Sequence, residues 1–127
     1  MSTYEEKIMS ILIAHKIPFE REKTFSDLKK GKFRYDFYLP SHNIIIECNG
    51  EQHYKQISHF HRLHSDFQKA QEHDRRKISY ALANGITMYC IPYWEIPNLH
   101  GVFDILNSKF EAKDRWHNDK VWREYQK

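Results

Sequence analysis

Two β-rich segments joined by a turn sequence limit the folds that this chain can adopt. Residues 33–39 alternate apolar or aromatic side chains with polar ones, which is typical of a strand with one buried face. Residues 44–48 begin with three successive isoleucines, and such a β-branched run is typical of a strand buried on both faces. The intervening Pro-Ser-His-Asn has turn chemistry, so the sequence predicts an antiparallel hairpin near the middle of a sheet.

Helical and extended patterns surround this hairpin. Apolar residues at helical spacing predict a helix over residues 3–15, with Ser2 or Thr3 as its N-terminal cap. Later patterns predict an extended piece at 19–25, a lysine-rich loop at 27–32, helical character over 58–82, a third buried strand at 86–91 and a helix over 97–110. The order of these elements predicts an α/β (α+β) fold in which helices flank a mixed β-sheet.

The composition is that of a globular protein inside a cell. The 127 residues fit a single domain, 1–127, and 40% of them are hydrophobic, which is enough for a core without disulfides. Cys48 and Cys90 lie in or beside apolar runs, so we expect buried free thiols and a reducing, cytoplasmic setting. No apolar stretch resembles a signal core or a membrane span, so we expect no membrane partner. The net charge of +3 permits binding to nucleic acid.

An acidic residue lies on each strand of the predicted hairpin. With a turn centred between residues 41 and 42, facing residues have numbers that sum to 83, so Asp36 lies opposite Glu47. Facing residues have Cβ atoms about 4.5–5.5 Å apart, and two carboxylates there repel each other unless a cation such as Mg²⁺ or Mn²⁺ binds them. The alternative is a solvated pair on an exposed sheet face. Glu47 argues against it, because it follows three isoleucines and burial of a lone carboxylate is costly.

The residues around these acids follow a family pattern. Residues 35–40 read Tyr-Asp-Phe-Tyr-Leu-Pro, and residues 44–53 read Ile-Ile-Ile-Glu-Cys-Asn-Gly-Glu-Gln-His. Together they resemble the core of PD-(D/E)XK nucleases, in the branch that is similar to very short patch repair endonucleases and to related phage and homing enzymes. Glu5 resembles the acid in the first helix of that branch, and Asp74 with Lys77 resembles the helix after the site.

This resemblance implies both a fold and an activity. The fold is a restriction-endonuclease-like domain with a core over about 2–93 and a C-terminal helical extension over about 97–127. The activity is metal-dependent hydrolysis of DNA phosphodiester bonds, by nicking or by double-strand cleavage. Asp36, Glu47 and the backbone carbonyl of Cys48 would hold one or two Mg²⁺ or Mn²⁺ ions. A phage or mobile-element setting fits the resemblance, and a homodimer or a larger complex would supply specificity that so short a chain lacks.

One position departs from the family pattern. The lysine that the family carries two residues after the glutamate is Asn49 here, where the branch usually has Asp, so the group that activates water stays open. His53, after the strand, is a candidate general base, and Gln52 beside it is a candidate hydrogen-bond donor to the same phosphate. Lys77 shares a helix face with Asp74 and would supply the positive charge missing at Asn49. For His53, the alternative is a histidine on the protein surface. For Asp74 and Lys77, the alternative is an ion pair on the surface of the helix.

Basic residues would hold the DNA backbone in this interpretation. They are Lys29, Lys30, Lys32, Arg34, Arg75 and Arg76. Equally, the lysines can form a solvated loop and the arginines a solvated helix surface.

Three other interpretations remain open. Because of Asn49, the chain can be a nuclease-fold protein that binds DNA and has lost catalysis. An HNH nuclease, suggested by His42 and Asn43, fits poorly because acids occupy the strands. Zinc bound by the histidines at 59, 61 and 64 is disfavoured because no cysteine pair completes a standard site.

Trp116 and Trp122 fit core packing or a dimer contact better than base stacking.

Overall fold

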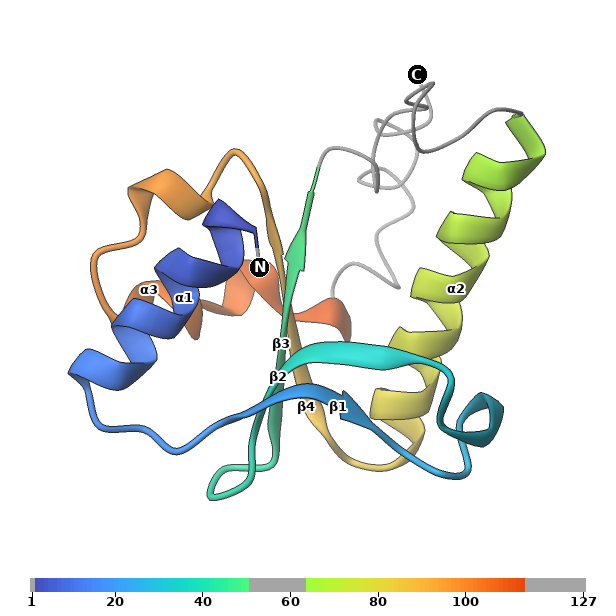
Figure 1. Ribbon diagram of the computed structural model, residues 1–127, viewed down its shortest axis with the longest axis horizontal. Coiled ribbons are helices and arrows are strands. Elements are labelled where there is room, and N and C mark those ends of the chain that lie inside the picture. Colours follow the sequence, from blue (N-terminus) through green and yellow to red (C-terminus); the bar gives the residue numbers. More distant parts are fainter. Residues whose placement is uncertain (1, 51–63, 114–127) are drawn as a thin grey trace.

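A four-stranded mixed sheet forms the centre of the protein in the computed structural model, which describes residues 2–50 and 64–113 (Figure 1). The strands lie side by side in chain order, with antiparallel pairing from the first to the third and parallel pairing between the third and the fourth. Helices flank this sheet, which confirms the predicted fold class. The strands are β1 (Glu20–Thr24), β2 (Arg34–Leu39), β3 (Ile44–Asn49) and β4 (Thr87–Pro92).

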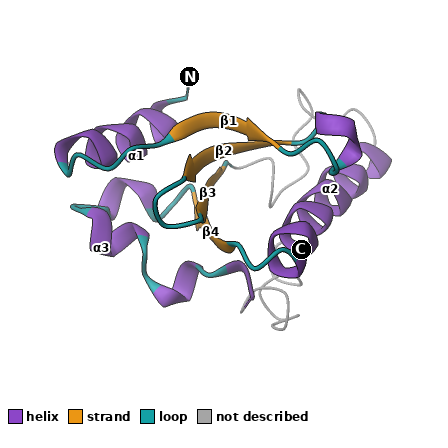
Figure 2. Cartoon of the chain, turned by 90° about the horizontal axis from the view of Figure 1, so that it is seen from below, coloured by secondary structure: helices purple, strands orange, loops and turns teal. Residues whose placement is uncertain are grey.

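Two long helices cover opposite faces of the sheet (Figures 1 and 2). Helix α1 (Thr3–Ala14) packs on one face and helix α2 (His64–Ala83) on the other. Each face has its own apolar core. The core under α1 includes Ile8, Leu12 and Ile46, whereas the core under α2 includes Ile45, Ile78 and Ala81. Strand β3 therefore contributes to both cores, as its β-branched sequence predicts.

The ends of the long helices follow the predicted signals. The Ser2 side chain accepts a hydrogen bond from the Glu5 N–H at 3.2 Å and caps the start of α1. Helix α2 ends at Ala83, and Gly85 follows it in a left-handed conformation with φ of 68°. The predicted helical start at residues 58–63 lies outside the described residues.

The prediction of one helix over residues 97–110 is wrong. Three short helical pieces occupy this segment instead: η3 (Ile96–Asn98), α3 (Val102–Ile105) and η4 (Ser108–Phe110). Gly101 is extended, with φ of −163°, and the Asp104 carboxylate accepts the N–H groups of His100 and Gly101 to start α3 afresh. The apolar spacing still buries one side of the segment, since Ile105 and Phe110 enter the core under α1.

Smaller predictions also have an outcome. The lysine-rich loop contains a short helical turn, η1 (Lys29–Gly31), in which Lys29 and Lys30 adopt left-handed backbone conformations. Both cysteines are free thiols; Cys90 is buried, as predicted, whereas Cys48 is only partly buried. In the part of the chain that the structure describes, no helix combines the length and the apolar character needed to cross a membrane.

Strands β2 and β3 pair only near their shared turn and then diverge. The pairs Phe37 with Ile46 and Leu39 with Ile44 have numbers that sum to 83, which confirms the predicted register. Beyond Phe37, β2 bends away from β3 (Figure 1). The side chains change face at this bend, because Phe37 lies in the core under α1 and Tyr35 lies in the core under α2. Asp36 is the residue between them, at the fork where the two strands separate.

Candidate active site

The fork between β2 and β3 brings the two predicted acids together. The register places Asp36 opposite Glu47, one step beyond the last paired residues. In place of a further ladder bond, the Asp36 carboxylate accepts the backbone N–H of Cys48 at 2.8 Å. This bond holds the carboxylate in the fork and directs it to the end of β3.

Asp36 is in an environment that disfavours its charge. Burial, the charge of Glu47 and a side-chain hydrogen bond with Glu47 raise the pKa of Asp36 from 3.8 to about 8, although the Cys48 N–H and Lys77 oppose the shift. The two carboxyl groups thus share a site that does not accept two negative charges at neutral pH without a further cation.

Lys77 neutralises the other acid. The Nζ of Lys77 lies 2.5 Å from Oε1 of Glu47, and Glu47 is only 5% exposed. Burial lowers the pKa of Lys77, but the charge of Glu47 and the hydrogen bond to it outweigh that effect, so the net direction is upward and the lysine stays charged. Lys77 therefore faces Glu47 rather than solvent, and its role in a catalytic site stays a prediction.

Tyr35 contacts Lys77 through both its hydroxyl and its ring. Its hydroxyl donates to the backbone carbonyl of Lys77 at 2.8 Å, and the Lys77 Nζ lies 5.0 Å from the centre of the Tyr35 ring. The ring contact is a cation–π interaction that favours the charged lysine. The sequence pattern identified Tyr35 only as a core aromatic residue, since nothing local shows that its hydroxyl reaches a helix 42 residues later.

Behind this pair is a small cavity of about 10 Å³, about the space of one water molecule. Glu47, Asn49, Asp74 and Lys77 line it on the polar side. Asn49 is 4% exposed, so its amide faces the protein interior rather than solvent. The structure therefore brings together four of the predicted site residues from β3 and α2.

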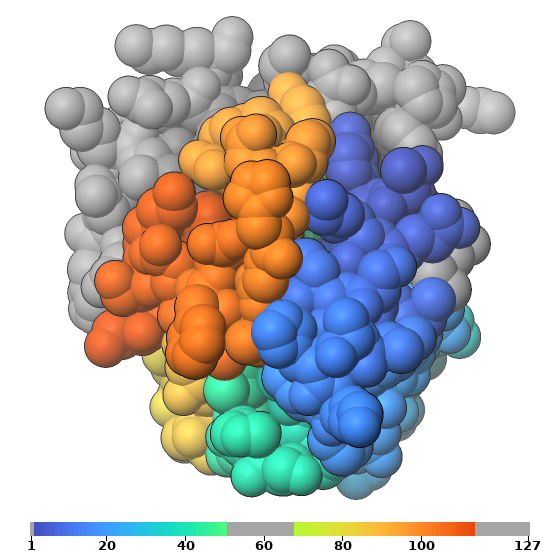
Figure 3. Space-filling view, turned by 90° about the vertical axis from the view of Figure 1, so that its left-hand side faces the viewer, coloured from blue at the N-terminus to red at the C-terminus, as the bar shows by residue number. Residues whose placement is uncertain are grey.

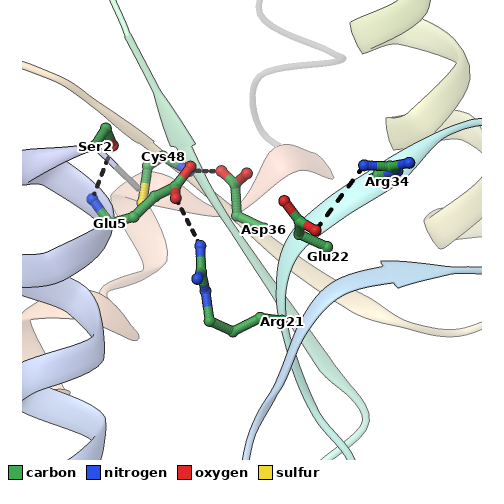
Figure 4. A network of polar contacts seen from close by, with 7 residues as sticks. All are labelled: Ser2, Glu5, Arg21, Glu22, Arg34, Asp36 and Cys48. Carbon is green, nitrogen blue, oxygen red and sulfur yellow. Dashed lines mark hydrogen bonds and ion pairs between the residues drawn. The ribbon is translucent and has the colours of Figure 1, made fainter.

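Glu5 approaches from the other face of the sheet. It lies in the first turn of α1 and forms a 2.8 Å ion pair with Arg21 of β1 (Figure 4). The Arg21 guanidinium also stacks over the Phe37 ring, 5.7 Å from its centre. The charges of Asp36, Glu47 and Glu5 all act on the Cys48 thiol and, with burial as the largest cause, raise its pKa. Arg21 was missed by the sequence reasoning, because β1 shows only alternation there.

Asp36 and Glu47 supply oxygen donors of the kind that a hard divalent cation prefers. In the described ranges, 2–50 and 64–113, no group of three or more His, Cys, Asp or Glu side chains is arranged to hold a metal ion. Asp36 and Glu47 would thus need backbone oxygen or water as further ligands, and the Cys48 carbonyl remains a prediction. Lys77 neutralises the Glu47 carboxylate but forms no ion pair with that of Asp36. The raised pKa of Asp36 is consistent with a carboxyl group that lacks a cation of its own. Carboxylates with few protein ligands are the usual setting for Mg²⁺.

The predicted basic residues form one groove and a separate edge. Lys29, Arg75 and Arg76 line a groove of about 480 Å³ between η1 and α2, together with Glu72. Glu72 lies 3.5 Å from Arg75 and 3.6 Å from Arg76. Lys30 and Lys32 are exposed in the same loop. Arg34 is also exposed, 3.9 Å from Glu22.

Several predicted residues cannot be placed. Gln52 and His53 lie outside the described residues, as do Trp116, Trp122 and the first two histidines of the zinc alternative, at 59 and 61. Of the third, His64, the backbone begins α2. These predictions stay as predictions.

Comparison with known proteins gives a distant likeness to a viral protein. No protein-family model matches the chain, and no solved structure matches it. The chain is similar to Uncharacterized protein 307L of Invertebrate iridescent virus 6, with 37% identity over 67 residues. The matched part covers 51% of this chain and 34% of the viral protein, so the chain spans about a third of that relative's length. The function of the site therefore rests on its own geometry and chemistry.

Proposed function

We propose that the protein is a metal-dependent DNA endonuclease with a PD-(D/E)XK-type site. The observation that carries the proposal is the meeting of Asp36, Glu47 and Lys77 at the fork of β2 and β3. They come from three elements that are separated in the chain, and nothing in core packing requires two carboxylates and a lysine there. Perturbed ionisable groups gathered in this way are typical of catalytic sites.

Each residue has a role that its surroundings support. Asp36 and Glu47 would hold one Mg²⁺ or Mn²⁺ ion, which supplies Lewis-acid stabilisation of charge on the scissile phosphate when bound. Lys77 supplies the positive charge that Asn49 does not, and Tyr35 fixes its position. A charged lysine beside the phosphate stabilises the negative charge that develops during hydrolysis. Glu5 and Arg21 form an ion pair at the same end of the sheet, on the face that α1 covers.

The groove between η1 and α2 supports DNA as the partner. Lys29, Arg75 and Arg76 gather there although Lys29 lies more than 40 residues before the two arginines in the chain. Such a cluster suits the phosphate backbone and carries no sequence preference of its own. Sequence specificity would then come from other contacts, such as those of a homodimer or a larger complex.

A second candidate is a nuclease-fold protein that binds DNA without cutting it. The buried Asn49, in place of the family lysine, favours this candidate. It predicts binding without metal-dependent cleavage, and no loss of binding in Asp36→Ala.

Incubation of supercoiled plasmid with the full chain tests the proposal. We expect relaxed or linear product in Mg²⁺ or Mn²⁺, none in EDTA, and at least a hundredfold less in Glu47→Gln. Asp104→Asn, which alters a carboxylate on α3 far along the chain from the fork, is the matched control and should cut at the wild-type rate. Intact plasmid under all metal conditions, with a gel shift that survives in Asp36→Ala, would establish the second candidate instead.

A further inference from the structure

The face shared by α1 and α3 carries an aromatic side chain in solvent. Helix α3 turns Val102 and Ile105 toward the core under α1 and leaves Phe103 outside. Phe103 is 86% exposed, more than any other large hydrophobic side chain that the structure describes. Burial of the ring against another surface would be favourable, because it removes apolar area from water. A single exposed ring is common on protein surfaces, so its meaning depends on what lies beside it.

A hollow with an apolar lining lies beside this ring. It has a volume of about 270 Å³ between α1 and the residues before α3, and its lining includes the buried Ile11 and Leu99. The Nε2 of His15, which also lines it, lies 3.6 Å from the point that a Cβ atom at Gly101 would occupy, directly before α3. Figure 3 shows α1 and the segment after β4 side by side on this surface. A cavity of about 150 Å³ holds benzene, so the hollow has room for one phenyl ring.

The charges beside the ring and around the hollow have opposite signs. The hollow is lined by the basic side chains of Lys7, His15 and His100, and no carboxylate is among the described residues that line it. Asp104 directly follows Phe103, and hydrogen bonds from backbone N–H groups, with that of His100 as the largest cause, lower the pKa of its carboxyl. Asp104 is therefore negative at neutral pH. One face of the protein thus presents a ring with an acid beside it and a hollow with a lysine beside it.

We propose that a second copy of this chain covers the hollow, and that Phe103 of each copy inserts into the hollow of the other. A two-fold axis makes the two contacts identical, because a ring and a hollow on one face form a self-complementary surface. In this dimer Asp104 of each copy approaches Lys7 of the other, so opposite charges meet beside the buried ring. The inference does not depend on the nuclease proposal, because each copy contains its own fork of β2 and β3.

Sedimentation of the full chain in EDTA, from low micromolar to several hundred micromolar concentration, measures the assembly. We expect the average mass to rise from monomer toward dimer with concentration, as mass action requires. Phe103→Ser should raise the dimer Kd at least about tenfold, because the burial of the ring is lost. Lys7→Glu should also raise it, since it places a like charge beside Asp104. Both side chains are exposed in the single chain, so the Tm of each variant in dilute solution should match that of the wild type.

Leu82→Ser and Lys69→Glu are the matched controls, because both residues are exposed on α2, on the opposite face of the sheet; both variants should keep the wild-type Kd. A monomer at every concentration would leave the hollow to a partner other than this chain and overturn the inference. An unchanged Kd in Phe103→Ser would overturn it as well. Plasmid cleavage in Mg²⁺, measured in parallel, separates the two proposals. Cleavage by a monomeric wild type rejects the dimer alone, whereas a Phe103-dependent dimer that leaves the plasmid intact supports the dimer and rejects the nuclease.

Discussion

The folded protein disfavours a negative charge on Asp36. Its pKa is about 8 in the folded, metal-free protein against an ordinary value of 3.8, with burial as the first cause and Glu47 as the second. The unfolded chain releases this proton near pH 4 and the folded chain only near pH 8. The metal-free protein therefore loses stability as the pH rises between these values, and the loss is complete above pH 8.

From this sign we predict that Asp36→Asn stabilises the metal-free protein. At pH 7.5 in EDTA its Tm should exceed that of the wild type by several degrees. The difference should shrink as the pH falls and disappear below pH 3.8, where the wild-type carboxyl becomes protonated in both states. Asp104→Asn is the opposite control. Hydrogen bonds from the His100 and Gly101 N–H groups lower the pKa of Asp104, so its loss should lower the Tm at neutral pH. A lower Tm for Asp36→Asn in EDTA would contradict the assignment.

The ion pair of Lys77 with Glu47 yields a second prediction. Lys77→Met leaves the Glu47 carboxylate buried without its cation, so we expect a loss of about 3–5 kcal/mol in the free energy of unfolding. Adding Glu47→Gln should recover most of that loss, because the buried charge is then gone. Denaturant unfolding of the two single variants and the double variant gives the coupling energy, and additive losses would show that the pair is not a unit.

At the level of elements, Tyr35 joins β2 to α2. Tyr35→Phe removes the hydroxyl that donates to the Lys77 carbonyl but keeps the ring under the Lys77 Nζ. We expect a stability loss of about 1 kcal/mol and a clear fall in kcat for plasmid cleavage, because the lysine loses its anchor. Tyr38, near the other end of β2, donates a similar hydrogen bond from its hydroxyl to Asn43, and Tyr38→Phe removes that bond. Its kcat should be unchanged, and an equal fall in both variants would refute the positioning role.

The elements also show what the sequence was able to predict. The hairpin register was correct because turn chemistry and alternation fix it locally, and with it the approach of Asp36 to Glu47. The helix over 97–110 was wrong because apolar spacing does not reveal that Gly101 extends the backbone and Asp104 starts a new turn. The pairs that complete the site join residues far apart in sequence, such as Arg21 with Glu5, so no local pattern contains them.

At the scale of the whole molecule, α1 and α2 cover opposite faces of the sheet (Figure 2). The groove lined by Lys29, Arg75 and Arg76 lies beside α2. Arg76→Ala should weaken DNA binding equally for all sequences and reduce the slope of log affinity against log salt by about one. Glu72→Gln should strengthen binding, since Glu72 lies beside both Arg75 and Arg76 and competes for them with phosphate.

Lys7→Ala is the control for the salt titration. Lys7 lines a separate hollow between α1 and Leu99 on the other side of the sheet, so its removal should leave the slope unchanged. An equal change in slope for Lys7→Ala and Arg76→Ala would mean that DNA contacts the protein without regard to the groove.

The order of the strands has a consequence for the time at which activity arises. The three antiparallel strands are contiguous from residue 20 to 49, so a chain emerging from the ribosome can form the hairpin with both carboxylates early. The parallel partner of β3 comes only after α2, because a parallel pair requires a long crossover. Lys77 belongs to that crossover. We therefore expect a nascent chain to carry its two acids without the lysine, and to gain the complete site only when synthesis has passed β4.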